Sequence, residues 1–284
     1  MFSVVWLCKG RHYIAIPTEN GILSSTFFPI NAGSLKLPFQ KEYKLVSNNV
    51  VLGPDVQSLL LEQDLRGVVF DLDGTLLDSA TDIMDGMRLT FEHSGYGVLA
   101  PDYVSDNLHG TCENIMQHII NDMGWQQPTE FDSLKEQYFR YYASLNYRNT
   151  QLYPGALAVL QACAQAGLAI GVCTNKSYAS ALSVSQLLHI DTYFNTISGS
   201  DSWGQAKPSP VPLLETIRSL GVQPEQCLYF GDTSVDALCA SRADVRFVLH
   251  TAGYGDVGLR DSSWYAAFEQ WNQLALPSPL AAQA

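Results

Sequence analysis

The chain of 284 residues has few basic side chains, no closely spaced cysteine pair and no long apolar run. Its 16 Lys and Arg stand against 28 Asp and Glu, giving a net charge of −12. This argues against nucleic acid or an anionic membrane surface as a partner, since both attract clustered cations. Six cysteines are scattered without a Cys-x-x-Cys motif, so we expect free thiols and a reducing cytoplasm. The apolar start, Met1 to Cys8, is too short to span a membrane and lacks the basic residues of a signal peptide.

What the sequence does contain is an alternation of short apolar runs and helix-period segments from residue 67 onward. This pattern is typical of a parallel sheet covered by helices, so we expect an α/β fold. The predicted strands are 67–71, 168–174, 193–197, 226–230 and 246–250. The predicted helices are 154–166, 178–188, 210–220 and 235–241.

Residues 80–149 interrupt this alternation, because they contain helical periodicity but no convincing strand. Ile83, Met87 and Phe91 share one predicted helix face, and two further apolar faces follow before residue 149. We expect a helical insertion over the edge of the sheet. A lid that excludes water and selects substrates is one interpretation, and ordinary helix packing is the other.

The two ends of the chain carry no catalytic motif. We expect a division into an N-terminal extension (1–64), a core (65–79 and 150–258), a helical cap (80–149) and a C-terminal segment (259–284). For the extension, an accessory unit, a disordered segment and a wrongly chosen start all remain open. In the C-terminal segment we expect a last helix at 264–274, which Pro277 would end.

Two carboxylates, Asp71 and Asp73, follow the first predicted strand and are succeeded by Gly74 and Thr75. Residues two apart at a strand end lean to the same side, so these carboxylates repel one another unless a cation or a proton is present. Gly74 permits a sharp turn with exposed backbone amides that bind anions. The alternative is an ordinary Asp-Gly turn.

Three further groups of polar residues fall at the same predicted sheet edge. Thr174 and Asn175 precede a helix, where a phosphate or a plain helix N-cap would suit them. Lys207 stands before a proline-rich helix start and is either a phosphate ligand or a surface charge. Asp232 ends another strand, with Asp236 one helical turn later. Chance placement of such groups at four strand ends is a weaker explanation than a common phosphate site.

These motifs, in this order and spacing, resemble those of the haloacid dehalogenase (HAD) superfamily, and in particular its phosphoglycolate phosphatase branch. The residues that carry the resemblance are Asp71-x-Asp73-Gly74-Thr75, Thr174-Asn175-Lys176, Lys207-Pro208 and Gly231-Asp232 with Asp236. It covers roughly residues 67 to 255. It implies a Rossmann-like core with an inserted α-helical cap, acting on a small phosphorylated metabolite; the oligomeric state stays open.

The resemblance also implies a role for each motif. Asp71 would be the nucleophile that forms an aspartyl-phosphate, and Asp73 would be the general acid and base. Mg²⁺ would be held by Asp71, the backbone carbonyl of Asp73, and Asp232. Phosphoryl oxygens would be bound by Thr174, Asn175 and Lys207, while Asp236 would orient Lys207 or support the metal.

Three other functions are alternatives to a phosphatase. Hydrolytic dehalogenases lack a carboxylate at the position of Asp73, so its presence favours an oxygen leaving group. Sugar-phosphate mutases carry a histidine where this chain has Ile83, which makes phosphotransfer the less favoured alternative. A non-catalytic phosphate-binding regulatory protein would not need the complete set of motifs. In the cap, the candidates for leaving-group contacts are Arg88, His93, His109 and Arg148, with surface or capping roles as the alternative.

Overall fold

The computed structural model describes residues 59–129 and 131–274, and before them only the backbone of six short strands. These strands are β1 (Val4–Cys8), β2 (Arg11–Ala15), β3 (Phe28–Pro29), β4 (Leu35–Lys36), β5 (Glu42–Val46) and β6 (Val50–Leu52). The chain divides into two compact units, Met1–Pro54 and Asp55–Ala284. In the first unit, β1, β2 and β3 form one antiparallel sheet and β4, β5 and β6 form another.

The second unit is built on a six-stranded sheet in which every neighbouring pair is parallel. In spatial order its strands are β11 (Thr196–Ser198), β10 (Ala169–Cys173), β7 (Gly67–Phe70), β12 (Cys227–Gly231), β13 (Arg246–His250) and β14 (Ala266–Phe268). The strand of this sheet that comes first in the sequence, β7, lies between β10 and β12. The carboxyl ends of these three strands therefore meet at one edge. The prediction of an α/β fold with a parallel sheet is confirmed.

Helices cover both faces of this sheet. They are α5 (Ala156–Gln165), α6 (Tyr178–Leu187), α7 (Val211–Ser219) and α8 (Ser234–Ala243). On one face Phe70 stacks on Phe230 at 4.9 Å between ring centroids and lies 5.9 Å from Trp271. On the other face α7 packs so closely that a Cβ at Gly171 would lie 2.8 Å from Thr216 Cγ2. Burial of β7 on both faces accounts for its uninterrupted apolar sequence.

The last part of the second unit differs from the sequence-based expectation. The predicted helix at 264–274 is wrong, because the structure has β14 followed by the short 3₁₀ helix η4 (Trp271–Leu274). Ala266, Ala267 and Phe268 are buried and pair with β13, so the open edge of the sheet decides their conformation. The predicted strand 193–197 is shifted as well. It starts three residues later as β11, because η1 (Asp191–Tyr193) includes the first position of the predicted strand.

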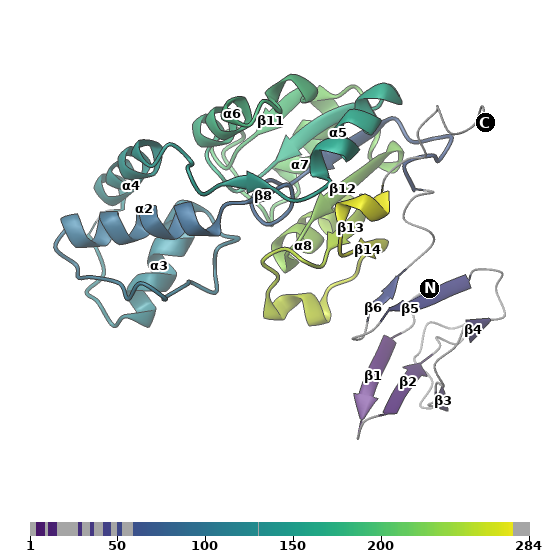
Figure 1. Ribbon diagram of the computed structural model, residues 1–284, viewed down its shortest axis with the longest axis horizontal. Coiled ribbons are helices and arrows are strands. Elements are labelled where there is room, and N and C mark those ends of the chain that lie inside the picture. Colours follow the sequence, from purple (N-terminus) through teal and green to yellow (C-terminus); the bar gives the residue numbers. More distant parts are fainter. Residues whose placement is uncertain are drawn as a thin grey trace. The chain divides into compact units, whose positions relative to one another are not determined.

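Three helices separate the first motif from the rest of the core: α2 (Ala80–His93), α3 (Cys112–Asp122) and α4 (Asp132–Ser144). They form a group at one end of the sheet (Figure 1). The chain leaves and re-enters the core through β8 (Leu77–Asp78) and β9 (Gln151–Leu152), which pair antiparallel. We call the segment 79–150 between them the cap. None of the described helices is both long and apolar enough to cross a membrane.

A buried carboxylate joins the two connections of the cap. Asp82, in the first turn of α2, is fully buried and accepts hydrogen bonds from the backbone N–H and side-chain amide of Asn149 and from the Thr150 hydroxyl. These distances are 3.0, 2.9 and 2.7 Å. Such a buried charge is tolerated because its oxygens are satisfied. Asp82 therefore fixes the start of α2 to the segment that returns to the core.

Candidate active site

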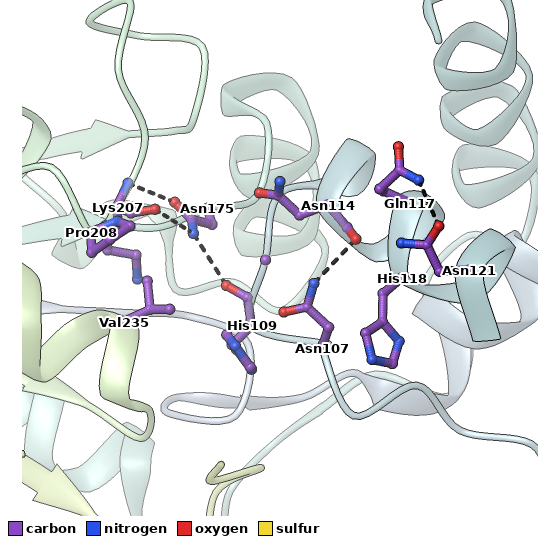
Figure 2. Close-up of a pocket in the computed structure, with 11 residues that line it drawn as sticks. Asn107, His109, Asn114, Gln117, His118, Asn121, Asn175, Lys207, Pro208 and Val235 are labelled. Carbon is purple, nitrogen blue, oxygen red and sulfur yellow. Dashed lines mark hydrogen bonds between the residues drawn. The ribbon is translucent and has the colours of Figure 1, made fainter. Parts of the chain in front are cut away.

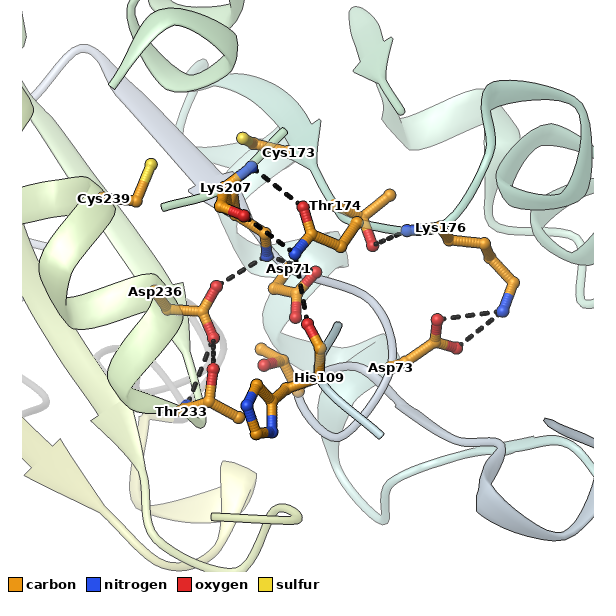
Figure 3. Close-up of polar contacts among 12 residues, drawn as sticks. Asp71, Asp73, His109, Cys173, Thr174, Lys176, Lys207, Thr233, Asp236 and Cys239 are labelled. Atoms are coloured by element: carbon orange, nitrogen blue, oxygen red, sulfur yellow. Dashed lines mark hydrogen bonds and ion pairs between the residues drawn. The ribbon is translucent and has the colours of Figure 1, made fainter. Parts of the chain in front are cut away.

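Strand ends and one loop bring the predicted residues together at the carboxyl edge of the sheet. Asp71 follows β7, Thr174 follows β10, and Asp232 follows β12. The ammonium of Lys207, from the loop before α7, lies 2.9 Å from Asp71 Oδ1 and 2.6 Å from Asp236 Oδ1 (Figure 3). All five side chains are buried. Residues from five separate positions in the sequence thus form one polar cluster inside the fold.

Asp236 is the anchor of Lys207, and its own oxygens are fully occupied. Oδ1 accepts from Lys207 and from the Tyr229 hydroxyl, both at 2.6 Å. Oδ2 accepts from the backbone N–H and hydroxyl of Thr233 and from the backbone N–H of Asp232. Burial alone would raise the pKa of Asp236, but the Lys207 ammonium and these hydrogen bonds lower it below its usual value.

Lys207 remains an ammonium in this buried position. Burial alone would lower its pKa, but the neighbouring carboxylates Asp236 and Asp71 raise the pKa above the ordinary value. Its ammonium also donates to the Tyr229 hydroxyl at 3.0 Å. Tyr229 is a site residue that the sequence did not predict; the signal was a single tyrosine inside the otherwise apolar strand β12.

The site contains more buried negative charge than Lys207 can balance. Burial, together with the charges of Asp236 and Asp73, raises the pKa of Asp71 to about 7, although Lys207 lowers it. Burial and the charges of Asp236 and Asp71 also raise the pKa of Asp232 well above its usual value. The Lys207 ammonium lies off the direction of a hydrogen bond to Asp71 Oδ1, which is buried without such a bond among the described residues.

A divalent cation fits this arrangement. Carboxylate oxygens of Asp71, Asp232 and Asp236 lie within 4.8 Å of one another, and Asp71 and Asp232 retain capacity because only Asp236 is already saturated. Asp232 is held by Thr75 Oγ1 at 3.0 Å and by the Tyr254 backbone N–H at 2.7 Å. Hard oxygen donors of this kind suit Mg²⁺, and a cation would relieve the excess negative charge.

Two glycines give Asp232 the space that it needs. A Cβ at Gly74 or at Gly253 would overlap the Asp232 side chain. Gly74 also has a φ of +82°, which favours glycine. The Gly74 carbonyl accepts a hydrogen bond of 2.9 Å from His250 Nδ1 at the end of β13. His250 is a further site residue that the sequence motifs did not predict.

The carboxylate of Asp73 points away from Asp71, toward the cap (Figure 3). Lys176 Nζ lies 2.9 Å from each of its two oxygens, and Ser79 Oγ donates to Oδ1 at 2.5 Å. Burial would lower the pKa of Lys176, but Asp73 raises it above the ordinary value. The sequence placed Lys176 beside Thr174 and Asn175 without assigning it a role.

The side chain of Asn175 binds backbone atoms. Its Oδ1 accepts from the Lys207 N–H at 2.9 Å, and its Nδ2 donates to the carbonyls of Lys207 and His109, both at 3.2 Å (Figure 2). Asn175 therefore fixes the backbone of Lys207 and at the same time contacts the cap. The neighbouring Thr174 Oγ1 accepts from the Lys176 N–H at 3.2 Å, which leaves its hydroxyl hydrogen available for a ligand.

Two cavities flank Asn175 and Gly110, which line both of them. The larger, of about 410 Å³, lies between the polar side of α3 and Lys207 (Figure 2). The smaller, of about 40 Å³, is lined chiefly by apolar and aromatic side chains, with Asp73 and Lys176 as its only charged residues.

The four cap residues that the sequence suggests as leaving-group contacts have different surroundings in the structure. His109 lines the larger cavity, and burial lowers its pKa. Arg88 is bound to Asp85 and to two backbone carbonyls, and the Arg148 side chain is 65% exposed. His93 contacts the carbonyl of Leu89 in its own helix. Of these four, His109 alone faces one of the two cavities.

Comparison with known proteins assigns the family. The model of the haloacid dehalogenase-like hydrolases matches residues 68–250, well over half of the chain. The chain belongs to this family. It is similar to the phosphoglycolate phosphatases of Aquifex aeolicus and Cereibacter sphaeroides, each 31% identical, over 67% and 74% of this chain and 86% and 96% of the relatives. The predicted resemblance to this branch of hydrolases is confirmed.

A solved structure supports the same assignment. A Bacteroides fragilis protein described as a haloacid dehalogenase-like hydrolase has a TM-score of 0.66 and 27% identity to this chain. The match covers 74% of this chain and 99% of that protein. The Rossmann-like parallel sheet with its inserted helical cap is thus the fold of this hydrolase family.

Proposed function

We propose that this hydrolase is a Mg²⁺-dependent phosphatase that cleaves a small phosphate monoester through an aspartyl-phosphate. One observation carries the proposal: the buried carboxylate of Asp71 lies 2.9 Å from the Lys207 ammonium and within 4.8 Å of a carboxylate oxygen of Asp232, at the carboxyl edge of a parallel sheet. Ligands of open α/β sheets bind at this edge. Because its relatives are named phosphoglycolate phosphatases, phosphoglycolate is the first substrate to test.

In the first step, a carboxylate oxygen of Asp71 attacks the phosphorus atom. The bond between phosphorus and the ester oxygen breaks, and a proton from Asp73 passes to that oxygen, which leaves as an alcohol. In the second step, a water oxygen attacks the phosphorus, Asp73 takes the proton, and the bond to Asp71 breaks. The products are inorganic phosphate and regenerated Asp71.

Charge stabilisation supports both steps. Lys207 and the Thr174 hydroxyl would donate to the phosphoryl oxygens, and the saturated Asp236 keeps Lys207 in place. Mg²⁺ would be held by Asp71, Asp232 and the backbone carbonyl of Asp73, and there it would neutralise charge on carboxylate and phosphate. The Asn175 side chain holds the backbone of Lys207 in place, and a direct contact of the Asn175 side chain with phosphate is not required.

The test is phosphate release from a panel of phosphate monoesters, including phosphoglycolate, by the purified full-length chain with Mg²⁺. We expect turnover of at least one ester, and Asp71→Asn should lower kcat by about 10³-fold or more, because it removes the nucleophile. Asp102→Asn, at an exposed cap position, is the matched control and should retain activity. Full activity of Asp71→Asn, or no release from any ester, contradicts the proposal. An isomerised sugar phosphate without free phosphate would indicate a mutase.

A further inference from the structure

Lys176 lies between the core and the cap, in the smaller cavity. Its ammonium is 2.9 Å from both oxygens of Asp73 and 4.8 Å from the ring centroid of Tyr142, which belongs to α4 of the cap. The side chain is only 5% exposed. This lysine therefore contacts the proposed acid on one side and a cap aromatic ring on the other.

The ion pair between Lys176 and Asp73 conflicts with the proposed role of Asp73 as the general acid and base. To reach an ester oxygen, Asp73 needs a free carboxylate oxygen, but Lys176 occupies both oxygens and Ser79 also binds Oδ1. Lys176 must therefore release at least one of them. A buried ammonium that loses its partner is strongly destabilised unless another anion replaces it. The rest of the lining of the smaller cavity is apolar or neutral and offers no such anion.

We propose that the leaving group of the substrate supplies this anion, so that Lys176 is a specificity-determining residue. The inference rests on the proposed phosphatase function. Lys176 exchanges Asp73 for a negatively charged group on the departing alcohol, and Asp73 then becomes free to reach the ester oxygen. A neutral alcohol cannot complete the exchange, and Lys176 stays bound to Asp73.

The cavity also limits the size of that group. A space of about 40 Å³ admits roughly three or four non-hydrogen atoms, because one water needs about 10–15 Å³ on this measure. Ile83 and Tyr138 border the same space and leave no room for a long chain without movement of the cap. The preferred substrate is therefore a phosphate monoester of a short alcohol that carries an anionic group.

The first experiment compares two esters of equal size, phosphoglycolate and its primary amide, in wild-type and Lys176→Met proteins. We expect wild-type kcat/KM to favour the carboxylate by about tenfold or more, as a charge-assisted hydrogen bond allows. In Lys176→Met that preference should fall below about threefold. Lys135→Met, which removes a half-buried cap lysine paired with Glu113 and Asp132, should keep the wild-type preference. Equal loss of activity on both esters in Lys176→Met would overturn the inference, because it would show a structural pair only.

The second experiment does not depend on turnover. Asp71→Asn and the double variant Asp71→Asn with Lys176→Met are titrated with both esters by calorimetry, after thermal unfolding confirms that each variant folds. Tighter binding of the carboxylate in the first protein, lost in the second, supports the role of Lys176 even if no ester is hydrolysed. Equal binding of the two esters by Asp71→Asn overturns it, whatever the outcome of the activity panel. Lys176→Gln replaces Lys176→Met if the latter does not fold.

Discussion

The hydroxyl of Tyr229 donates a hydrogen bond of 2.6 Å to Asp236 Oδ1, the same oxygen that receives the Lys207 ammonium. Lys207 in turn donates to that hydroxyl at 3.0 Å. The Tyr229 hydroxyl, the Lys207 ammonium and Asp236 Oδ1 therefore form a closed triangle of contacts next to Asp71. Lys207 is thus restrained by two acceptors besides Asp71.

We predict that Tyr229→Phe removes the two hydroxyl contacts of this triangle without creating a large cavity. A net contribution of about 0.5–1.5 kcal/mol per hydrogen bond suggests that the free energy of unfolding falls by about 2 kcal/mol. The inhibition constant of inorganic phosphate should rise several-fold, since Lys207 loses one of its restraints. Urea denaturation and product inhibition measure the two effects. Tyr178→Phe, at an exposed tyrosine, serves as the control and should change neither.

Asp82 supports the second prediction. Asp82→Ala leaves the buried Thr150 hydroxyl and the part-buried donors of the exposed Asn149 without an acceptor, so the free energy of unfolding should fall by about 3 kcal/mol. Hydrogen exchange should accelerate most at the start of α2 and around residues 149–150. Glu92→Gln, exposed on the same helix, should leave stability within about 0.5 kcal/mol of wild type. Uniform exchange across the whole protein would argue against a local role for Asp82.

The raised pKa values predict how pH and metal affect stability. Burial raises the pKa of Asp71 from 3.8 to about 7 and that of Asp232 well above 3.8, so the folded metal-free protein binds more protons than the unfolded chain between about pH 4 and 7. The stability that Asp71 and Asp232 contribute is therefore fully present below about pH 4 and is lost as pH rises through 7. The pKa of Asp236 is shifted in the opposite direction, so the contribution of Asp236 to stability is lost only below about pH 4.

Mg²⁺ should counter this loss of stability at high pH, because the metal favours the ionised carboxylates that burial disfavours. We expect the increase in Tm on adding Mg²⁺ to the EDTA-treated protein to be larger at pH 8 than at pH 5, as measured by scanning calorimetry. Asp232→Asn should reduce that increase at pH 8. A metal effect that is equal at both pH values would contradict a site made of Asp71 and Asp232.

Asp244 provides a prediction about stability alone. It ends α8 in the left-handed conformation, with a φ of +55°, a position where glycine is favoured. Asp244→Gly should keep or raise the free energy of unfolding by up to about 1 kcal/mol, whereas Asp244→Ala should lower it by about 1 kcal/mol. Both variants should retain kcat/KM. A more stable Asp244→Ala protein would show that the backbone conformation is not the cause.

The core was predictable because its signals are local and repeated. Each apolar strand ends at a polar motif, and the parallel order of β10, β7 and β12 then brings those motifs to one edge. The helical nature of the cap followed from its 3.6-residue periodicity. By contrast, β14 has the weak strand former Ala at two of its three positions, and its conformation depends on pairing with β13.

Contacts between distant segments were not predictable from the sequence. Lys176 and Asp73 are 103 positions apart, and their pairing depends on the loop after β10 facing the base of the cap. Tyr229 and His250 lie in strands whose apolar pattern predicts burial but not a hydrogen-bond partner. The sequence identified which residues lie at the edge, but not that Asn175 would bind the backbone of Lys207.

The loop that carries Asp73 and Gly74 is supported by residues far downstream in the chain. The indole N–H of Trp271 donates to the Thr75 carbonyl at 3.1 Å, and His250 contacts the Gly74 carbonyl at 2.9 Å. During synthesis, this loop emerges from the ribosome almost 200 residues before Trp271 does. The nascent chain therefore cannot complete its reactive centre until Trp271 has been translated, and a polypeptide cut short before Trp271 would carry the motifs without the geometry.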